Sequence, residues 1–173
     1  DAGEGYCVFN DAAVAIRTLQ REGLIARACV IDLDVHQGNG TASILAGDDS
    51  AFTLSMHGAK IFPLRKVPSD LDVPLADGTD DASYLELLDQ ALECLETQHR
   101  AAPFDLAIFL AGADPYHGDR LGRMQLTKQG LQQRDRHVIR WCGEQRVPRA
   151  IAMSGGYAHD IDDIVSIHAA TLR

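Results

Sequence analysis

Apolar residues follow one another almost without interruption in four short stretches of this chain. They lie at residues 28–31, 51–56, 104–110 and 150–153. Apolar runs of this length, bounded by polar or glycine-rich segments, are typical of strands that are buried on both faces of a parallel sheet. We therefore predict a strand at each of these positions.

Between the runs, apolar residues recur every three or four positions, as in amphipathic helices. Helices are predicted over residues 10–22, 82–99, 127–144 and roughly 161–172. Asn10 is a suitable N-cap for the first helix, Gly23 is a suitable stop, and the polar segment 63–81 is predicted to be a loop. The residues expected to face the core are Ala12, Val14, Ala15, Ile16, Leu19, Leu85, Leu88, Leu92, Leu95, Leu131, Val138, Ile139 and Trp141.

This alternation of helices and strands predicts an α/β fold in which helices cover both faces of a mostly parallel sheet. The 173 residues are 46% hydrophobic and 24% charged, without repeats or a linker, so we expect one domain over residues 1–173. No apolar stretch approaches the roughly 20 residues of a membrane span, and we expect no membrane partner. The net charge of −9 argues against direct nucleic-acid binding and is compatible with a basic partner.

The four cysteines, Cys7, Cys29, Cys94 and Cys142, are widely spaced and form no C-x-x-C pair. Their spacing therefore indicates neither a disulfide framework nor a cysteine zinc site. We expect a reducing compartment, and hence a cytoplasmic location.

The segment at residues 32–40, which directly follows the first predicted strand, contains candidate metal-ligating side chains. Alternation places Asp32, Asp34 and His36 on one face, with Leu33 and Val35 on the other. Burying two carboxylates without a partner charge costs several kcal/mol each, roughly. Because carboxylate and imidazole together suit zinc or a similar cation, we predict a metal site here.

Two later strands end in comparable segments. The run at 104–110 leads into Asp114, which can supply a third ligand, and the run at 150–153 leads into a glycine pair followed by Tyr157. Parallel α/β sheets bind ligands at the carboxyl ends of their strands. We therefore expect Asp114 and Tyr157 to converge with Asp34 and His36.

With these segments in place, the chain resembles the zinc-dependent histone deacetylases and their bacterial relatives, the acetoin-utilisation proteins and acetylpolyamine amidohydrolases. The resemblance rests on segments that span nearly the whole chain, at residues 5–11, 32–40, 54–57, 112–114, 118–122 and 155–157. The sequences at 37–40 and 70–73 are most similar to the class IV branch and its bacterial kin. The resemblance implies a three-layer fold of the arginase and deacetylase type.

The family's catalytic residues match positions of this chain. Asp34, His36 and Asp114 match its zinc ligands, and Tyr157 matches the tyrosine that donates a hydrogen bond to the developing oxyanion. Asp32 and Asn39 match residues that orient two active-site histidines. Some relatives carry aspartate where this chain has Asn39, so the two histidines are expected to be less symmetric in their acid–base roles.

Other positions match the family's substrate-binding and structural residues. Tyr6 and Leu121 match family residues that line the walls of the substrate tunnel. Gly5 matches a residue whose backbone carbonyl lies near the substrate amide, and Gly156 belongs to the same substrate-binding set. A structural K⁺ or Na⁺ ion is implied near Asp32, Ser55 and Met56. The histidines at 57, 99, 117, 137, 159 and 168 are expected to have structural or solvent-facing positions.

One family feature is missing from the sequence. The adjacent His-His pair, which supplies the general base and acid, precedes the segment that matches residues 5–11, and this chain contains no such pair. We therefore expect the chain to be the C-terminal part of a larger deacetylase domain, incomplete at the N-terminus and nearly inactive alone.

The implied reaction is zinc-assisted hydrolysis of an acetyl or longer acyl amide, on a lysine side chain of a peptide or on a related small amine. A non-catalytic protein that binds acyl-lysine or another partner is the alternative from a different class. An arginase-type ureohydrolase is disfavoured, because Gln37 and Gly38 stand where a second metal would need a further carboxylate.

Overall fold

The computed structural model describes residue 3 and residues 5–173, and within them it contains one five-stranded sheet. All neighbouring strands pair in parallel, in the order β3-β2-β1-β4-β5. The strands are β1 (Ala28–Asp32), β2 (Ala51–Gly58), β3 (Leu71–Leu75), β4 (Leu106–Gly112) and β5 (Arg149–Ser154). The predicted parallel α/β sheet is confirmed.

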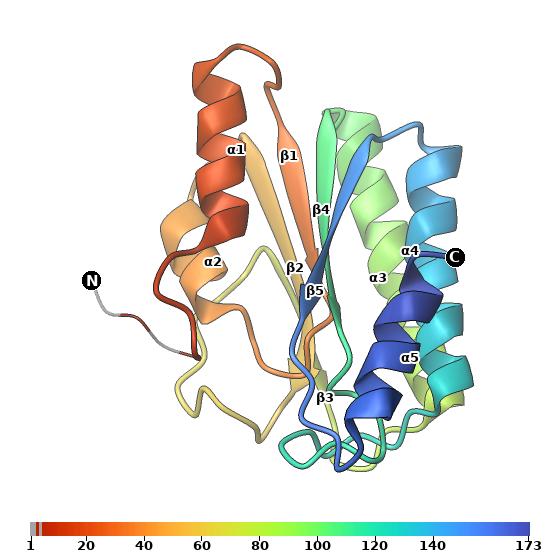
Figure 1. Cartoon of the computed structure of the whole chain (residues 1–173). Helices are drawn as coiled ribbons and strands as arrows, with labels where there is room; N and C mark the ends of the chain where they lie inside the picture. Colours follow the sequence, from red (N-terminus) through yellow and green to blue (C-terminus); the bar gives the residue numbers. More distant parts are fainter. Residues whose placement is uncertain (1–2, 4) are drawn as a thin grey trace.

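Helices cover both faces of this sheet. The helices are α1 (Asp11–Arg21), α2 (Asn39–Leu45), α3 (Asp81–Ala101), α4 (Lys128–Glu144) and α5 (Ile161–Thr171). Figure 1 shows α1 and α2 on one face of the sheet and α3, α4 and α5 on the other, which confirms the three-layer arrangement.

The two faces of the sheet carry hydrophobic clusters of different size, because side chains alternate along each strand. Cys29 and Ile31 of β1 belong to a large cluster that α3, α4 and α5 complete. Ala28 and Val30 belong to a small cluster completed by α1 and by Leu45 of α2. The core is therefore deepest on the side of α3, α4 and α5.

Polar side chains fix where the helices begin. The predicted cap Asn10 accepts a hydrogen bond from the backbone of Ala13, and Thr127 caps α4 in the same way through Gly130. One prediction for α1 was wrong: Val14 is 58% exposed. It lines a large cleft instead of the core, because α1 packs through the face that carries Ala12 and Ile16.

Two elements lie where the sequence pattern did not predict them. β3 falls inside the predicted loop 63–81, and Pro74 is compatible with it because β3 is an edge strand, which tolerates a missing backbone N–H. α2 has only seven residues, begins after Gly38 and has no side-chain cap. Its length is too short for a helical repeat to be visible.

No helix in the described part of the chain is long and apolar enough to span a membrane.

Candidate metal centre

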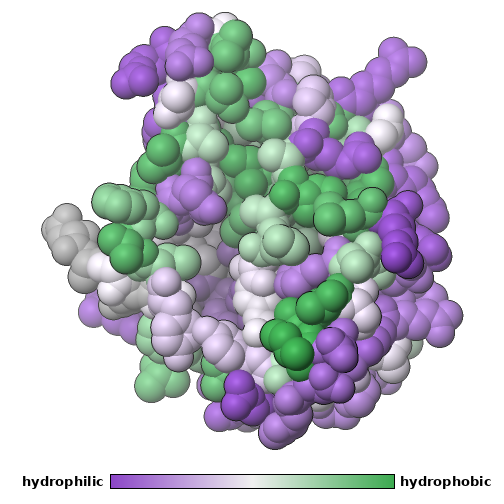
Figure 2. Space-filling model, viewed as in Figure 1, coloured by the Kyte–Doolittle hydropathy of each residue, from purple (hydrophilic) through white to green (hydrophobic). Residues whose placement is uncertain are grey.

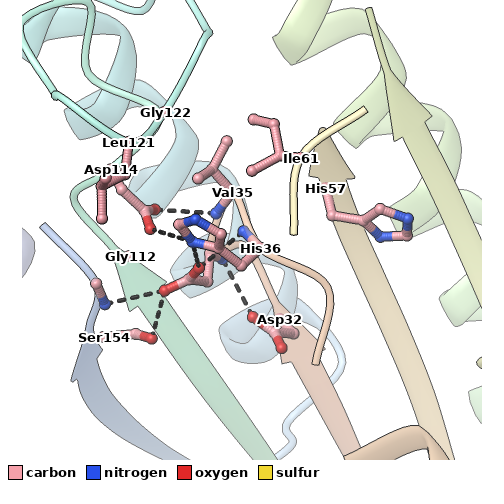
Figure 3. A network of polar contacts seen from close by, with 12 residues as sticks. Asp32, Val35, His36, His57, Ile61, Gly112, Asp114, Leu121, Gly122 and Ser154 are labelled. Carbon is pink, nitrogen blue, oxygen red and sulfur yellow. Dashed lines mark hydrogen bonds and ion pairs between the residues drawn. The ribbon is translucent and has the colours of Figure 1, made fainter. Parts of the chain in front are cut away.

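Three strand ends meet at one edge of the sheet and bring the predicted ligands together. Asp34 and His36 lie in the loop after β1, and Asp114 lies two residues after the end of β4. Figure 3 shows the His36 ring and the Asp114 carboxylate turned toward each other, with Ser154 nearby at the end of β5. The expected convergence of Asp34, His36 and Asp114 is therefore present.

The three side chains have a spacing that suits one small cation. His36 Nδ1 lies 3.1 Å from Asp34 Oδ1 and 3.1 Å from Asp114 Oδ2. One nitrogen or oxygen from each residue lies within 4.8 Å of the others. Two ligands bound at about 2.0–2.1 Å to a tetrahedral zinc ion lie about 3.4 Å apart, so small shifts would let this set hold zinc.

Each carboxylate is fixed by its second oxygen. Asp34 Oδ2 accepts hydrogen bonds from Ser154 Oγ at 2.7 Å and from the backbone of Gly155 at 2.9 Å. Asp114 Oδ1 accepts one from the backbone of Val35 at 2.9 Å. The oxygens that face His36 are thus held in place by the strand ends themselves.

Close packing leaves no room for a side chain beside these carboxylates. A Cβ atom on Gly155 would lie 2.3 Å from Asp114 Oδ2 and 2.6 Å from Asp34 Oδ2. Both distances are far below a van der Waals contact, so the site requires glycine at this position.

The pKa values of the three residues are strongly perturbed. Burial and the neighbouring Asp34 carboxylate raise the pKa of Asp114 to about 7. Burial also acts to raise the pKa of Asp34, but hydrogen bonds, led by the one from His36, outweigh it and lower this pKa to about 2. Hydrogen bonds to Asp114 and Asp34 raise the pKa of His36 to about 10. Without a metal, a protonated imidazole therefore balances the carboxylates.

Asp32 and Asn39 flank this group. Asp32 is buried at the end of β1 and accepts a hydrogen bond from the backbone of Asp34 at 3.1 Å. Burial and then the Asp34 charge raise the pKa of Asp32 well above its ordinary value. Asn39 begins α2, and its backbone donates to the Gln37 carbonyl. Both residues line the cleft that also exposes Asp34 and His36.

The predicted structural cation site falls on neighbouring strands. Asp32 pairs in register with Ser55 of β2, and Met56 follows Ser55 on the same strand. The Ser55 hydroxyl lies 2.9 Å from His57 Nδ1. His57 is itself buried on β2, apart from His36 (Figure 3), in agreement with the structural position expected for it.

Tyr157 lies on the turn after β5 and is 38% exposed. Its ring lies 5.8 Å from the ring of Tyr6, centroid to centroid, so two residues with predicted site roles are neighbours although they are far apart in sequence. Tyr6 itself is 87% exposed. Gly5 precedes it and lines the cleft.

The two remaining predicted substrate-binding residues lie after β4 and after β5. Leu121, 40% exposed, is on the loop after β4, and Gly156 is on the turn after β5. A Cβ atom on Gly156 would lie 3.0 Å from Ile164 and 3.2 Å from Ala113, so this turn packs tightly on α5 and on the end of β4.

The cleft beside the centre has a volume of about 820 Å³. Its walls come from the segment before α1, from α1 itself, from the loop that carries Asp34 and His36, and from the end of β5. This volume is in the range of small-molecule sites.

Sequence patterns did not reveal three residues that support the centre. Asp119 accepts hydrogen bonds from the backbones of Leu121 and Gly122 and from that of Tyr157, which joins the two loops. Gln37 is buried and exchanges hydrogen bonds with the backbone of Val67, which ties the His36 loop to the segment before β3.

The third, Arg134 of α4, is wholly buried behind the ends of β1 and β4. The sequence held one indication of this role, an arginine on a helix that is predicted to face the core. Arginine is almost never fully buried unless it is paired, so a buried arginine there implies polar partners.

Comparison with known proteins identifies the family of the chain. The chain matches the model of the histone deacetylase domain over residues 1–172. It is 45% identical over 171 residues to an uncharacterized protein of Picosynechococcus sp., covering 99% of this chain and 56% of that protein. It is 34% identical over 160 residues to histone deacetylase 2 of Arabidopsis thaliana, covering 91% of this chain and 41% of the relative.

Among solved structures, the crystal structure of an acetylpolyamine aminohydrolase from Burkholderia pseudomallei superposes with a TM-score of 0.82 at 26% identity. The match covers 99% of this chain and 51% of that one. The chain thus spans about half the length of the relatives that it matches. Because the family model covers nearly every residue, the chain belongs to the histone deacetylase family.

Proposed function

We propose that the protein containing this chain is a zinc-dependent hydrolase that removes acetyl or longer acyl groups from lysine side chains or from related small amides. The observation that carries the proposal is the Asp34, His36 and Asp114 group at the neighbouring ends of the parallel strands β1 and β4. It offers one imidazole nitrogen and two carboxylate oxygens within 4.8 Å. Three protein ligands with an open fourth position are the arrangement of catalytic zinc sites.

A zinc ion held by these residues would supply a Lewis acid for amide hydrolysis. The chain's own residues then bind and orient it: Asp34 and Asp114 are pre-positioned by Ser154, Gly155 and Val35. Fixed ligands lose little freedom on binding, which favours a tight and geometrically defined site.

Tyr157 is proposed to donate a hydrogen bond to the oxyanion that forms at the acyl carbon. Asp32 and Asn39 are proposed to orient the active-site histidines, and Gly5, Tyr6, Leu121 and Gly156 to contact the substrate. The contact between the Tyr6 and Tyr157 rings supports a shared substrate surface. A structural K⁺ or Na⁺ near Asp32, Ser55 and Met56 completes the proposal.

The proposed substrate is an acylated lysine peptide or an acetylated small amine. Relatives named histone deacetylase and acetylpolyamine amidohydrolase support these two classes, and the net charge of −9 suits a basic substrate. The four free cysteines support a reducing, cytoplasmic location.

We further propose that these 173 residues alone turn over little substrate. The sequence contains no adjacent His-His pair to act as general base and acid, and its relatives are about twice as long. Binding of acyl-lysine without hydrolysis is the alternative function.

Zinc titration of the purified chain tests the metal site. We expect one zinc ion per chain, and we expect binding to be lost in His36→Ala and in Asp114→Asn. His117→Ala removes an exposed imidazole from a loop and serves as the matched control. A wild-type chain that binds no zinc, or a His36→Ala variant that binds it normally, would contradict the proposal.

Activity is tested in the gene product that contains this chain, with acetyl-lysine peptide and acetylated polyamine compared as substrates. Tyr157→Phe should lower kcat by roughly 100- to 1,000-fold, as for the loss of an oxyanion donor, while zinc content stays unchanged. Equal turnover in the variant would remove Tyr157 from the mechanism. Acyl-lysine binding without turnover in the wild type would favour the non-catalytic alternative.

A further inference from the structure

Behind the metal centre, one buried cation joins the two strand ends that carry the carboxylate ligands. Arg134 of α4 has no exposed surface. Its Nη1 donates to the carbonyl of Gly112 at 2.7 Å and to the carbonyl of Leu33 at 3.3 Å. Leu33 directly precedes Asp34, and Gly112 lies two residues before Asp114, so a single nitrogen contacts the backbone beside both ligands.

A second residue balances the charge of this guanidinium. Arg134 Nε donates to Asp135 Oδ1 at 2.8 Å, and Nη2 lies 2.7 Å from the same oxygen as an ion pair. Asp135 Oδ2 in turn accepts a hydrogen bond from the Thr171 hydroxyl of α5 at 2.6 Å. Because the pair is neutral as a whole, Arg134 acts on the strand ends mainly through its hydrogen bonds rather than through its charge.

Stability alone does not require an arginine at this position. A buried ion pair replaced by apolar side chains of similar volume is often as stable or more stable, since both charges no longer have to be desolvated. An apolar residue, however, offers no donor to the carbonyls of Leu33 and Gly112. What distinguishes Arg134 is therefore that it links these two carbonyls.

We propose that Arg134 is a positioning residue of the metal centre, which sets the separation between the backbones of Asp34 and Asp114 and thereby the spacing of the two carboxylate ligands. The inference rests on the proposed metal site. It adds that metal affinity and coordination geometry depend on a side chain in α4 that touches neither the ion nor the substrate.

The test compares metal binding in the 173-residue chain and in two variants. Arg134→Met combined with Asp135→Leu removes the link and leaves no unpaired buried charge. Arg134→Lys keeps one cationic donor without the planar fork. Zinc affinity is measured by competition with a chromophoric chelator, and the visible absorption of bound Co²⁺ reports the coordination geometry.

We expect the double variant to fold, to bind zinc at least about 10-fold more weakly, and to show an altered Co²⁺ spectrum, with the lysine variant between it and the wild type. Leu95→Ala is the control, because it cuts a cavity into the same core at a wholly buried leucine of α3. It should lower the melting temperature without changing metal affinity.

Wild-type zinc affinity and Co²⁺ spectrum in the folded double variant would overturn the inference. If the double variant does not fold, the zinc affinity and the Co²⁺ spectrum of Arg134→Lys test the inference instead, and wild-type values of both would overturn it. A wild-type chain that binds neither ion would instead overturn the proposed function and this inference with it.

Discussion

His36 lies between two carboxylates and carries a proton that a metal ion must displace. Hydrogen bonds to Asp114 and Asp34 raise its pKa to about 10, so the imidazole of the metal-free chain is protonated at neutral pH. A zinc ligand must be the neutral imidazole. Metal and proton therefore compete for the same nitrogen.

We predict that zinc binding releases protons. At pH 8.5 Asp114, whose pKa is raised to about 7, is ionised, so about one proton should be released per zinc, from His36. Zinc affinity should rise as the pH rises toward 10, because the competing proton is lost. Calorimetry in buffers of different ionisation enthalpy measures the release, and zinc binding without proton release at this pH would show that His36 is neutral beforehand.

Gly155 gives a second prediction at the scale of one residue. Gly155→Ala should abolish zinc binding and destabilise the chain, because its Cβ would overlap the carboxylates of Asp34 and Asp114. Gly143→Ala is the matched control: nothing lies within 4 Å of a Cβ there, and alanine in the α4 helix should stabilise the chain by up to about 1 kcal/mol. Zinc titration and thermal unfolding of both variants measure their metal binding and their stability. Normal binding by Gly155→Ala would mean that the strand ends can move apart.

The convergence of Asp34, His36 and Asp114 was predictable because each follows an apolar run and parallel strands end at one edge. Asp119 was not, since its partners are backbone N–H groups, one of them at Tyr157, and no side-chain pattern encodes them. Arg134 was missed for a similar reason. Its acceptors are the backbone carbonyls of Leu33, directly after β1, and of Gly112, at the end of β4, and no side-chain pattern encodes such acceptors.

At the scale of elements, the predicted strands and helices lie within about two residues of the observed bounds, and the two elements missed were the short helix α2 and the edge strand β3. α2 and β3 are defined by their tertiary surroundings: β3 pairs in register with β2, and α2 packs on β2 and α1. Both elements brace the loop that carries His36. Local sequence alone does not contain that information.

The loops after β4 and β5 behave as one unit because Asp119 joins them. Asp119→Ala would leave the N–H groups of Leu121, Gly122 and Tyr157 without their acceptor. An unsatisfied buried donor costs about 1–3 kcal/mol, and water replaces part of the loss at these half-exposed loops. We expect the free energy of unfolding to fall by about 1–2 kcal/mol and amide hydrogen exchange to accelerate in both loops.

Asp77→Ala is the control for this prediction. It removes an exposed carboxylate whose ion pair with Arg123, at 3.4 Å, contributes little. In this variant the rate of amide hydrogen exchange at Tyr157 should equal that of the wild type. Unchanged exchange at Tyr157 in Asp119→Ala would show that the turn after β5 is held by other contacts.

On the scale of the whole molecule, the edge strand β5 is the most exposed part of the sheet. Its residues are exposed or half-buried throughout, and within the described residues it pairs with β4 alone. Figure 2 shows apolar side chains gathered on the face where β5 lies, and Met153 is 68% exposed. Open edges beside apolar surface favour association with another chain.

We therefore predict that the 173-residue chain associates with itself as its concentration rises. Met153→Lys should shift the equilibrium toward monomer, as measured by light scattering or sedimentation. Leu64→Lys makes the same chemical change at an exposed leucine in the loop between β2 and β3, at the opposite side of the sheet. An equal shift in both variants would mean that added charge, rather than the β5 edge, controls association.

The unequal hydrophobic clusters also set the order in which the molecule comes apart. The layer of α1 and α2 rests on small side chains such as Ala12 and Ala13, whereas the opposite layer buries leucines, Phe109 and Trp141. Local opening follows the weakest cooperative unit, so we expect α1 to detach while α3, α4 and α5 stay packed on the strands. In that partly melted form part of one sheet face is bare, whereas α2 and β3 still hold the His36 loop and the three metal-ligand side chains remain assembled.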